Sequence, residues 1–261
     1  MRILIFITSL FFWAIGIKTA DAVIPSGKED VAITSDGIKL HGTAQYPDNK
    51  KKIAILLLIA GSGPIDREGN VPGLTNNSLK YLSNELTEKG IATLRYYKRG
   101  IGESSYCGFS NTSVRLDDYV DDAAKWIKFL KSRKKFTKVI VAGHSEGSLI
   151  GMLAAQQAGA DGFISLNGPG RPADELIIEQ VSKPQTPPNV VGQVKTGEKV
   201  EDIPPYLMNL VQPDIQPYLV SWFKHNPANE IAKLKIPVLI IQGYKAGKKP
   251  TIDSTGVTFI Q

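Results

Sequence analysis

The strongest constraint on the fold is a Gly-His-Ser-Glu-Gly run at residues 143–147, which lies between two apolar segments of different character. Residues 138–142 form a short apolar segment with β-branched side chains, as in a buried strand. Residues 148–155 have small and apolar side chains, as in a buried helix. A serine on such a strand-to-helix turn projects from the sheet, and flanking glycines allow close backbone approach. We therefore predict that Ser145 is a nucleophile. The alternative is an ordinary glycine-rich turn without chemistry.

Hydrophobic periodicity around this turn predicts an α/β fold. Residues 30–34 and 38–46 alternate apolar and polar side chains about Asp36-Gly37, which is a strong β-hairpin signal. Residues 53–60 are continuously apolar, as expected for a central parallel strand that is covered on both faces. Alternating strands and helices of this kind indicate a mostly parallel sheet with right-handed crossovers. Further strands are expected at residues 91–97, 162–166 and 238–242, and helices at residues 76–89 and 113–134.

The alternation stops near residue 168, and prolines become frequent up to about residue 230. Amphipathic pieces remain at residues 174–181 and 205–223. We predict an inserted helical lid over about residues 171–230 that encloses an apolar pocket beside Ser145. The alternative is a segment that only shields the sheet. The side chains expected to face inwards are Leu176, Ile177, Leu207, Met208, Leu210, Trp222 and Phe223.

The first 22 residues have the features of a signal peptide. A basic start is followed by an apolar run over residues 3–17 and by Ala20-Asp21-Ala22, a typical cleavage site. We expect export to the periplasm or the medium, with residues 23–261 as one α/β domain. The alternative is a membrane anchor. The apolar run is shorter than the roughly 20 residues that span a bilayer, which favours the signal peptide, and no stable span is expected after cleavage.

Composition argues against several other classes of protein. The net charge of +6 is spread along the chain, and no recognised nucleic-acid module is present, so no nucleic-acid partner is expected. Cys107 is the only cysteine, which excludes an intramolecular disulfide and favours a structural thiol. Neither a Cys/His cluster with zinc spacing nor a phosphate-binding loop occurs, so we expect no metal and no cofactor.

Two glycine-rich loops are expected beside Ser145. Residues 60–64 (Ala-Gly-Ser-Gly-Pro) follow the central strand, and the backbone N–H groups of Ser62 and Glu146 are candidates for an oxyanion hole. Asp66 and Arg67 continue this loop and are candidates either to fix it by ion pairing or to contact the substrate. Residues 95–104 form the second loop, which is interpreted as a structural support for the site.

These loops together resemble those of the α/β-hydrolase superfamily, and more narrowly of exported serine aminopeptidase S33-like and esterase-like hydrolases. The resemblance implies acyl transfer from a small-molecule ester or peptide to water. Ser145 would then be the nucleophile, and the Ser62 and Glu146 amides the oxyanion hole. The segments that carry the resemblance are residues 61–64 with Asp66, Arg67, Gly69 and Asn70, residues 98–102, residues 143–147 and the strand at residues 236–243.

The departures from this family concern the partners of the serine. Its members commonly have aspartate where this chain has Tyr97 and Ala246, and they continue into a further strand, a histidine loop and a final helix. Only His225 follows Ser145, and it precedes the last predicted strand, while His144 is expected to pack away from the nucleophile. We therefore expect a truncated or frameshifted chain with an atypical tail at residues 244–261, lacking the last strand and helix and impaired as a hydrolase. The alternative is a non-catalytic binding protein on a hydrolase scaffold.

Overall fold

The computed structural model describes residues 27–47, 53–106, 108–181, 189–243, 251–252 and 258–259. The expected signal peptide, Cys107 and Ala246 lie outside these ranges, as does most of the expected tail. Within the tail, β8 (Thr251–Ile252) and β9 (Thr258–Phe259) pair with each other in an antiparallel ladder.

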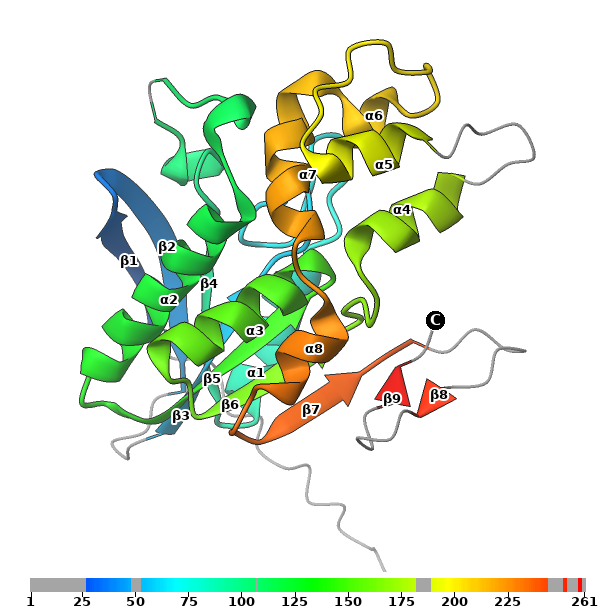
Figure 1. Cartoon of the computed structure of the whole chain (residues 1–261). Helices are drawn as coiled ribbons and strands as arrows, with labels where there is room; N and C mark the ends of the chain where they lie inside the picture. The colour runs from blue at the N-terminus through cyan, green and yellow to red at the C-terminus, as the bar shows by residue number, and fades with distance from the viewer. Residues whose placement is uncertain are drawn as a thin grey trace, which may run out of the picture.

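A seven-stranded sheet forms the centre of the structure, with the order β1-β2-β4-β3-β5-β6-β7 (Figure 1). β1 pairs antiparallel with β2, and β2 with β4, while all other neighbours are parallel. The predicted α/β fold, with a mostly parallel sheet and an N-terminal hairpin, is confirmed. The strands are β1 (Gly27–Ser35), β2 (Ile38–Tyr46), β3 (Ile53–Ile59), β4 (Ala92–Tyr96), β5 (Phe136–His144), β6 (Gly162–Leu166) and β7 (Val238–Ile241).

Helices cover both faces of this sheet. The main core lies beneath α2 (Leu116–Ser132) and α3 (Glu146–Ala158), and a smaller cluster lies beneath α1 (Ser78–Glu88). Successive side chains of a strand point to opposite faces, so β3 supplies both cores. Leu57 enters the main core, whereas Leu58 packs in the smaller cluster. The continuous apolar run at residues 53–60 therefore reflects burial on both faces.

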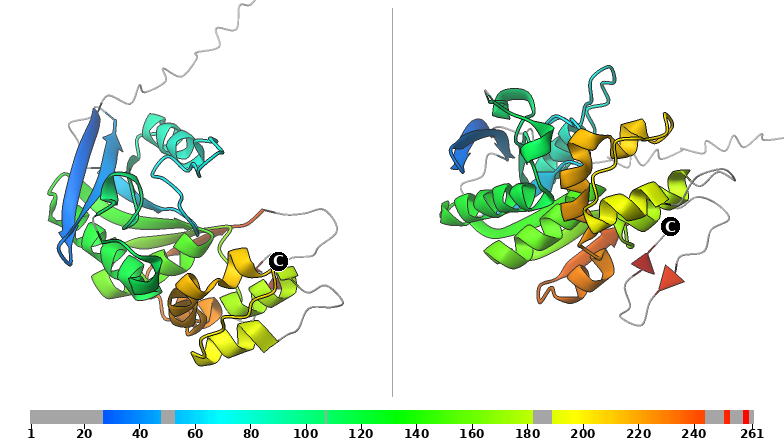
Figure 2. Two further views of the ribbon diagram at one scale, coloured as in Figure 1. Left: turned by 90° about the horizontal axis from the view of Figure 1, so that it is seen from above. Right: turned by 45° about the horizontal axis from the view of Figure 1, so that its top comes forward.

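The remaining helices gather on one side of the sheet (Figure 2). Residues that follow β4, β5 and β6 line one cavity together with residues of α4 and α7, so these helices lie over the carboxyl ends of the strands. The group has an apolar core of its own, in which Val194, Leu207, Val211 and Leu219 are almost fully buried. The helices of this group are α4 (Ala173–Val181), α5 (Asn189–Thr196), α6 (Met208–Val211) and α7 (Gln216–Phe223). The following helix, α8 (Pro227–Ala232), packs against α3 and contributes Ile231 to the main core.

Two expectations for this region were wrong in detail. The amphipathic piece at residues 205–223 is divided into α6, a 3-10 turn at Pro213–Ile215 and α7. Pro213 lacks the N–H that a continuous helix would need at that point, which explains the break. Met208 was expected to face inwards but is 39% exposed, whereas Leu207 and Phe223 are buried as predicted.

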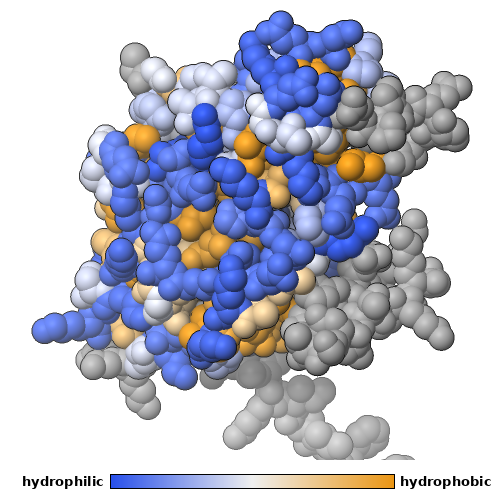
Figure 3. Space-filling model, in the orientation of Figure 1, coloured by the Kyte–Doolittle hydropathy of each residue, from blue (hydrophilic) through white to orange (hydrophobic). Residues whose placement is uncertain are grey.

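Hydrophilic residues predominate on the face shown in Figure 3, and apolar side chains show only in patches between them. None of the helices in the described ranges is long and apolar enough to cross a membrane.

A buried arginine ties the N-terminal hairpin to α2. The Arg99 guanidinium donates to both carboxylate oxygens of Asp122, at 2.7 Å (Nε–Oδ2) and 2.6 Å (Nη2–Oδ1). It also lies 3.4 Å from Asp36 in the hairpin turn and 3.4 Å from Asp118. Burial alone would lower the pKa of Arg99, but the hydrogen bonds with Asp122 and the neighbouring carboxylates raise it above its ordinary value. The guanidinium therefore stays charged and holds the three segments together.

Replacing Arg99 tests this link. We expect Arg99→Met to lower the free energy of unfolding by about 3–5 kcal/mol, because Asp122 would remain buried without its charged partner. Urea denaturation measures the change. Lys199→Met is the control, since Lys199 pairs with Glu201 in solvent and should leave the midpoint unchanged. Equal midpoints for Arg99→Met and the unaltered protein would contradict this role.

Candidate active site

Ser145 lies at the sharp turn between β5 and α3, where the sequence predicts it. Its backbone angles are φ 53° and ψ −124°, which a residue with a side chain rarely adopts. The Ser145 N–H donates to the carbonyl of Leu166 in β6 at 3.0 Å, and its own carbonyl accepts from the Ser148 N–H at 2.9 Å. Strain of this kind persists only where the surrounding structure fixes it, and it concentrates at functional sites.

The two glycines that flank this turn are required by close contacts between backbones. A Cβ atom on Gly143 would lie 2.0 Å from the carbonyl oxygen of Gly147. A Cβ atom on Gly147 would lie 2.4 Å from the carbonyl oxygen of Ala60, at the end of β3. Larger residues would therefore push α3 away from β3 and open the turn that holds Ser145.

The loop after β3 lies against the Ser145 turn. A Cβ atom on Gly61 would be only 3.2 Å from Ser145 Cβ, and Ser62 and Glu146 line the same cavity as Ser145. Among the described residues, no backbone carbonyl accepts a hydrogen bond from the N–H of Ser62 or Glu146. These two N–H groups can therefore donate to an oxyanion, and the positive end of the α3 dipole would support them.

The cavity that contains these groups has a volume of about 1160 Å³. One wall is made by the carboxyl ends of the sheet, and the other by the lid helices. Asn167 and Arg171 contribute polar groups, whereas most of the lid side is apolar or aromatic. The apolar and aromatic lining includes Phe109, Tyr119, Ile177, Leu210, Leu219 and Trp222.

A buried charged network lies beside Ser145, and sequence reasoning missed it. The Lys98 ammonium donates to the Gly61 carbonyl at 2.6 Å and lies 3.4 Å from the Glu146 carboxylate. Glu146 accepts a second hydrogen bond from the Tyr218 hydroxyl of α7, at 2.6 Å. Burial, and then the Glu146 charge, raise the pKa of Tyr218 well above its ordinary value. The only sequence feature that could have indicated this network is the position of Lys98 just after β4, because Ser145 also follows the carboxyl end of a strand.

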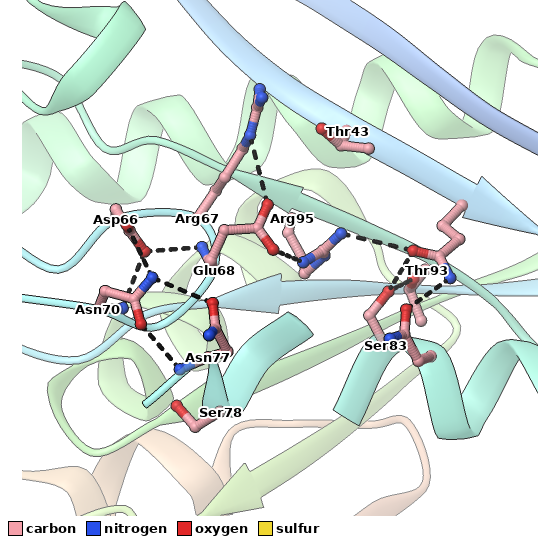
Figure 4. A network of polar contacts seen from close by, with 12 residues as sticks. Thr43, Asp66, Arg67, Glu68, Asn70, Asn77, Ser78, Ser83, Thr93 and Arg95 are labelled. Carbon is pink, nitrogen blue, oxygen red and sulfur yellow. Dashed lines mark hydrogen bonds and ion pairs between the residues drawn. The ribbon is translucent and has the colours of Figure 1, made fainter. Parts of the chain in front are cut away.

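Contacts within the protein hold Asp66 and Arg67 (Figure 4). Neither residue is among those that line the cavity. The Asp66 carboxylate accepts from the N–H groups of Glu68 and Asn70, both at 2.8 Å, which closes the loop on itself. Arg67 lies 3.4 Å from Glu103, and its guanidinium is 4.8 Å from the centre of the Tyr97 ring. These contacts support the interpretation in which both side chains fix the loop.

Deeper in the same network, Glu68 forms an ion pair with the buried Arg95 of β4 (Figure 4). The Glu68 carbonyl accepts from the N–H groups of Leu79 and Lys80 at 3.1 Å, so the loop is tied to the start of α1 as well as to the sheet. The segment that carries Ser62 is therefore anchored on both sides.

None of the three histidines, all of which lie in the described ranges, forms a hydrogen bond with the Ser145 hydroxyl. His41 lies in β2, 3.8 Å from Glu103. His225 lies 3.8 Å from Asp117 in α2 and 3.8 Å from Glu230 in α8. His144 is exposed at the end of β5 rather than packed as expected, and partial burial still lowers its pKa. The described residues include no cluster of three or more His, Cys, Asp or Glu side chains that could bind a metal.

Comparison with known proteins identifies relatives of this chain. The model of the serine aminopeptidase S33 family matches residues 71–189. Esterase EstD of Thermotoga maritima is 31% identical over 229 residues, which cover 85% of this chain and 53% of the esterase. The chain thus spans about half the length of this curated relative.

Solved esterases share the fold at low sequence identity. Est1E of Butyrivibrio proteoclasticus, with ferulic acid bound, is 20% identical with a TM-score of 0.57, over 80% of this chain and 77% of that one. An esterase of Pyrococcus furiosus is 17% identical with a TM-score of 0.54, over 82% of this chain and 69% of that one.

Gly147→Ala tests the close contact that holds the turn. We expect the free energy of unfolding to fall by about 1–3 kcal/mol, because the added methyl group meets a backbone carbonyl that has little room to move. Gly192→Ala in α5 is the matched control, since a Cβ atom there meets nothing within 4 Å. It should raise the stability by about 0.5–1 kcal/mol. Chemical denaturation of both variants decides, and a stable Gly147→Ala protein would contradict the contact.

Proposed function

We propose that this chain, which belongs to the α/β-hydrolase superfamily, is a serine hydrolase that cleaves an ester or peptide bond through an acyl-enzyme at Ser145. The observation that carries the proposal is the strained Ser145 turn, which lies in one cavity with Ser62 and Glu146, whose N–H groups have no backbone acceptor in the part of the chain that the structure describes. Strain at a serine has no evident use in a passive scaffold, but it exposes a nucleophile beside an oxyanion hole.

In this proposal, the Ser145 hydroxyl gives up its proton to water as its Oγ attacks the substrate carbonyl carbon, and the carbonyl oxygen becomes an oxyanion. The Ser62 and Glu146 amides donate to that oxygen, where negative charge develops. The intermediate collapses as the leaving alcohol or amine takes up a proton from water, which leaves an ester on Ser145. Water then cleaves this ester and restores the serine. The size and apolar lining of the cavity favour a small-molecule substrate with a bulky apolar group.

We further propose that the residues of this sequence support only slow turnover. A serine hydroxyl is a weak nucleophile near neutral pH and needs a base within hydrogen-bond reach. The contacts of His41 and His225 are with carboxylates that do not line the Ser145 cavity, and His144 is the residue next to Ser145 in the turn. Loss of a triad member costs on the order of 10⁴ to 10⁶ in turnover in serine proteases.

The lack of a histidine contact with Ser145 also favours a second candidate, a non-catalytic protein that binds an apolar small molecule in this cavity. The scaffold and the pocket would then serve binding, and Ser145 would act only as a hydrogen-bonding group. Covalent chemistry at Ser145 separates the two candidates.

Labelling with a fluorophosphonate tests the hydrolase proposal. We expect the reagent to form a phosphorus–oxygen bond with Ser145 and to release fluoride, and Ser145→Ala to abolish the label. Ser62→Ala is the control, because it keeps the backbone N–H and should still be labelled. Turnover of a p-nitrophenyl ester should be slow.

An unlabelled protein that still binds apolar ligands would favour the binding candidate. Rapid labelling with ordinary ester turnover would contradict the slow-turnover proposal, because it would require a base that the contacts of the three histidines do not supply.

We also propose that the protein is exported, on the sequence of residues 1–22 alone. After expression of the full chain in a bacterial host, the N-terminus of the protein recovered from the periplasm or the medium should be Val23. Recovery of only uncleaved protein in the membrane fraction would instead support an anchor.

A further inference from the structure

Lys98 and Glu146 form a buried ion pair that the acyl-transfer steps do not use directly. Each side chain is only 2% exposed, and Lys98 Nζ lies 3.4 Å from Glu146 Oε2. Removing two charges from water is costly, so such a pair persists only with further polar partners. Here the further partners are the Gly61 carbonyl for Lys98 and the Tyr218 hydroxyl for Glu146.

The hydrogen bond to Gly61 bears directly on the oxyanion hole. The Gly61 carbonyl and the Ser62 N–H belong to the same peptide unit, which is planar, and in a trans peptide they point in opposite directions. By holding the Gly61 oxygen at 2.6 Å, Lys98 fixes the direction of the Ser62 N–H on the other side of that unit. A peptide that follows a glycine would otherwise rotate at little cost.

The charge of Lys98 also acts on the strength of this donor. A cation at the carbonyl oxygen polarises the peptide unit, and polarisation strengthens a hydrogen bond that the same unit donates. Glu146 balances the charge of Lys98, and its own N–H is the second candidate donor to the oxyanion. The ion pair therefore joins the two chain segments that carry the two donors.

Tyr218 connects this pair to the lid. Its hydroxyl comes from α7 and donates to Glu146 at 2.6 Å, and its ring lies 5.7 Å from that of Tyr119. Tyr119 also lies beneath the Lys98 ammonium, 5.1 Å from ring centre to Nζ. The position of α7 is thus coupled through Glu146 and Lys98 to the Gly61–Ser62 peptide.

We propose that Lys98, Glu146 and Tyr218 are positioning residues that aim the Ser62 N–H at the oxyanion and make this alignment depend on the seating of lid helix α7. The inference rests on the proposed hydrolase function. It predicts that the oxyanion hole is complete only when α7 is docked, so a displaced lid would leave Ser145 without one of its two donors.

The test uses three variants of the full chain with two readouts. Lys98→Met removes the ammonium and keeps most of the stem, Tyr218→Phe removes one hydroxyl, and Tyr206→Phe is the matched control. Tyr206 is a lid tyrosine that is 51% exposed and does not line the cavity. The readouts are the backbone amide resonance of Ser62 and the rate of Ser145 labelling as a function of fluorophosphonate concentration.

We expect Lys98→Met to shift the Ser62 resonance and to lower the maximal labelling rate by about 10–100-fold. The reagent concentration for half-maximal rate should change little, because the apolar lid-side lining of the cavity stays in place. Tyr218→Phe should shift the same resonance and slow labelling by about 3–10-fold, as expected for loss of a single hydrogen bond. Tyr206→Phe should leave both readouts unchanged. A merely structural role would alter stability without this selective loss of the maximal rate.

Folded Lys98→Met and Tyr218→Phe proteins with an unchanged Ser62 resonance would overturn the inference. If Lys98→Met does not fold, Tyr218→Phe decides, because it removes only one oxygen atom. If the unaltered protein is not labelled, the hydrolase proposal fails, and the Ser62 resonance still decides whether the lid aligns this peptide.

Discussion

The site depends on the close approach of α3 to the end of β3. Only a glycine at position 147 allows the first turn of the helix to lie against the carbonyls of Ile59 and Ala60. This contact brings the Ser145 turn beside the loop that begins at Gly61, although the two segments are far apart in the sequence. The strained Ser145 turn therefore lies in one cavity with Ser62 and Glu146, the two candidate oxyanion donors.

Two buried cations, Arg95 and Lys98, then stabilise the loop that lies against the Ser145 turn. The loop after β3 carries no regular helix or strand, and these two cations hold it, one through an ion pair and one through a hydrogen bond to a backbone carbonyl. Arg95 pairs with Glu68 beyond the loop's turn, and Lys98 binds the Gly61 carbonyl at its start. Both cations come from the end of β4 or just after it, so this strand acts as the support for the oxyanion loop. The lid joins the same support through Tyr218 and Glu146.

Local features of the fold were predictable from the sequence because they depend on neighbouring residues. Asp36 and Gly37 have positive φ angles, of 50° and 80°, as an Asp-Gly hairpin turn requires, and β6 occupies residues 162–166 as expected. The Ser145 turn follows from its flanking glycines. Short helices such as α5 and α8 were missed, because four to eight residues give too little periodicity to recognise.

The buried network could not be predicted in the same way. Lys98 and Glu146 meet only after β4 and β5 are placed on either side of β3, and a lone lysine after a strand is usually solvated. Asp66 and Arg67 left two interpretations open at the sequence level. Their side-chain geometry, with Asp66 bonded to its own loop and Arg67 beside Tyr97, favours support of the loop.

The central claim is that Ser145 and the Ser62 and Glu146 amides form one acyl-transfer site. A crystal structure of the protein with an alkyl boronic acid tests it most directly, since boron bonded to a serine oxygen imitates the tetrahedral intermediate. We expect continuous density from Ser145 Oγ to boron, with one boronate oxygen about 2.7–3.1 Å from both backbone nitrogens. A boronate bonded elsewhere, or one whose oxygens face away from these amides, would contradict the claim.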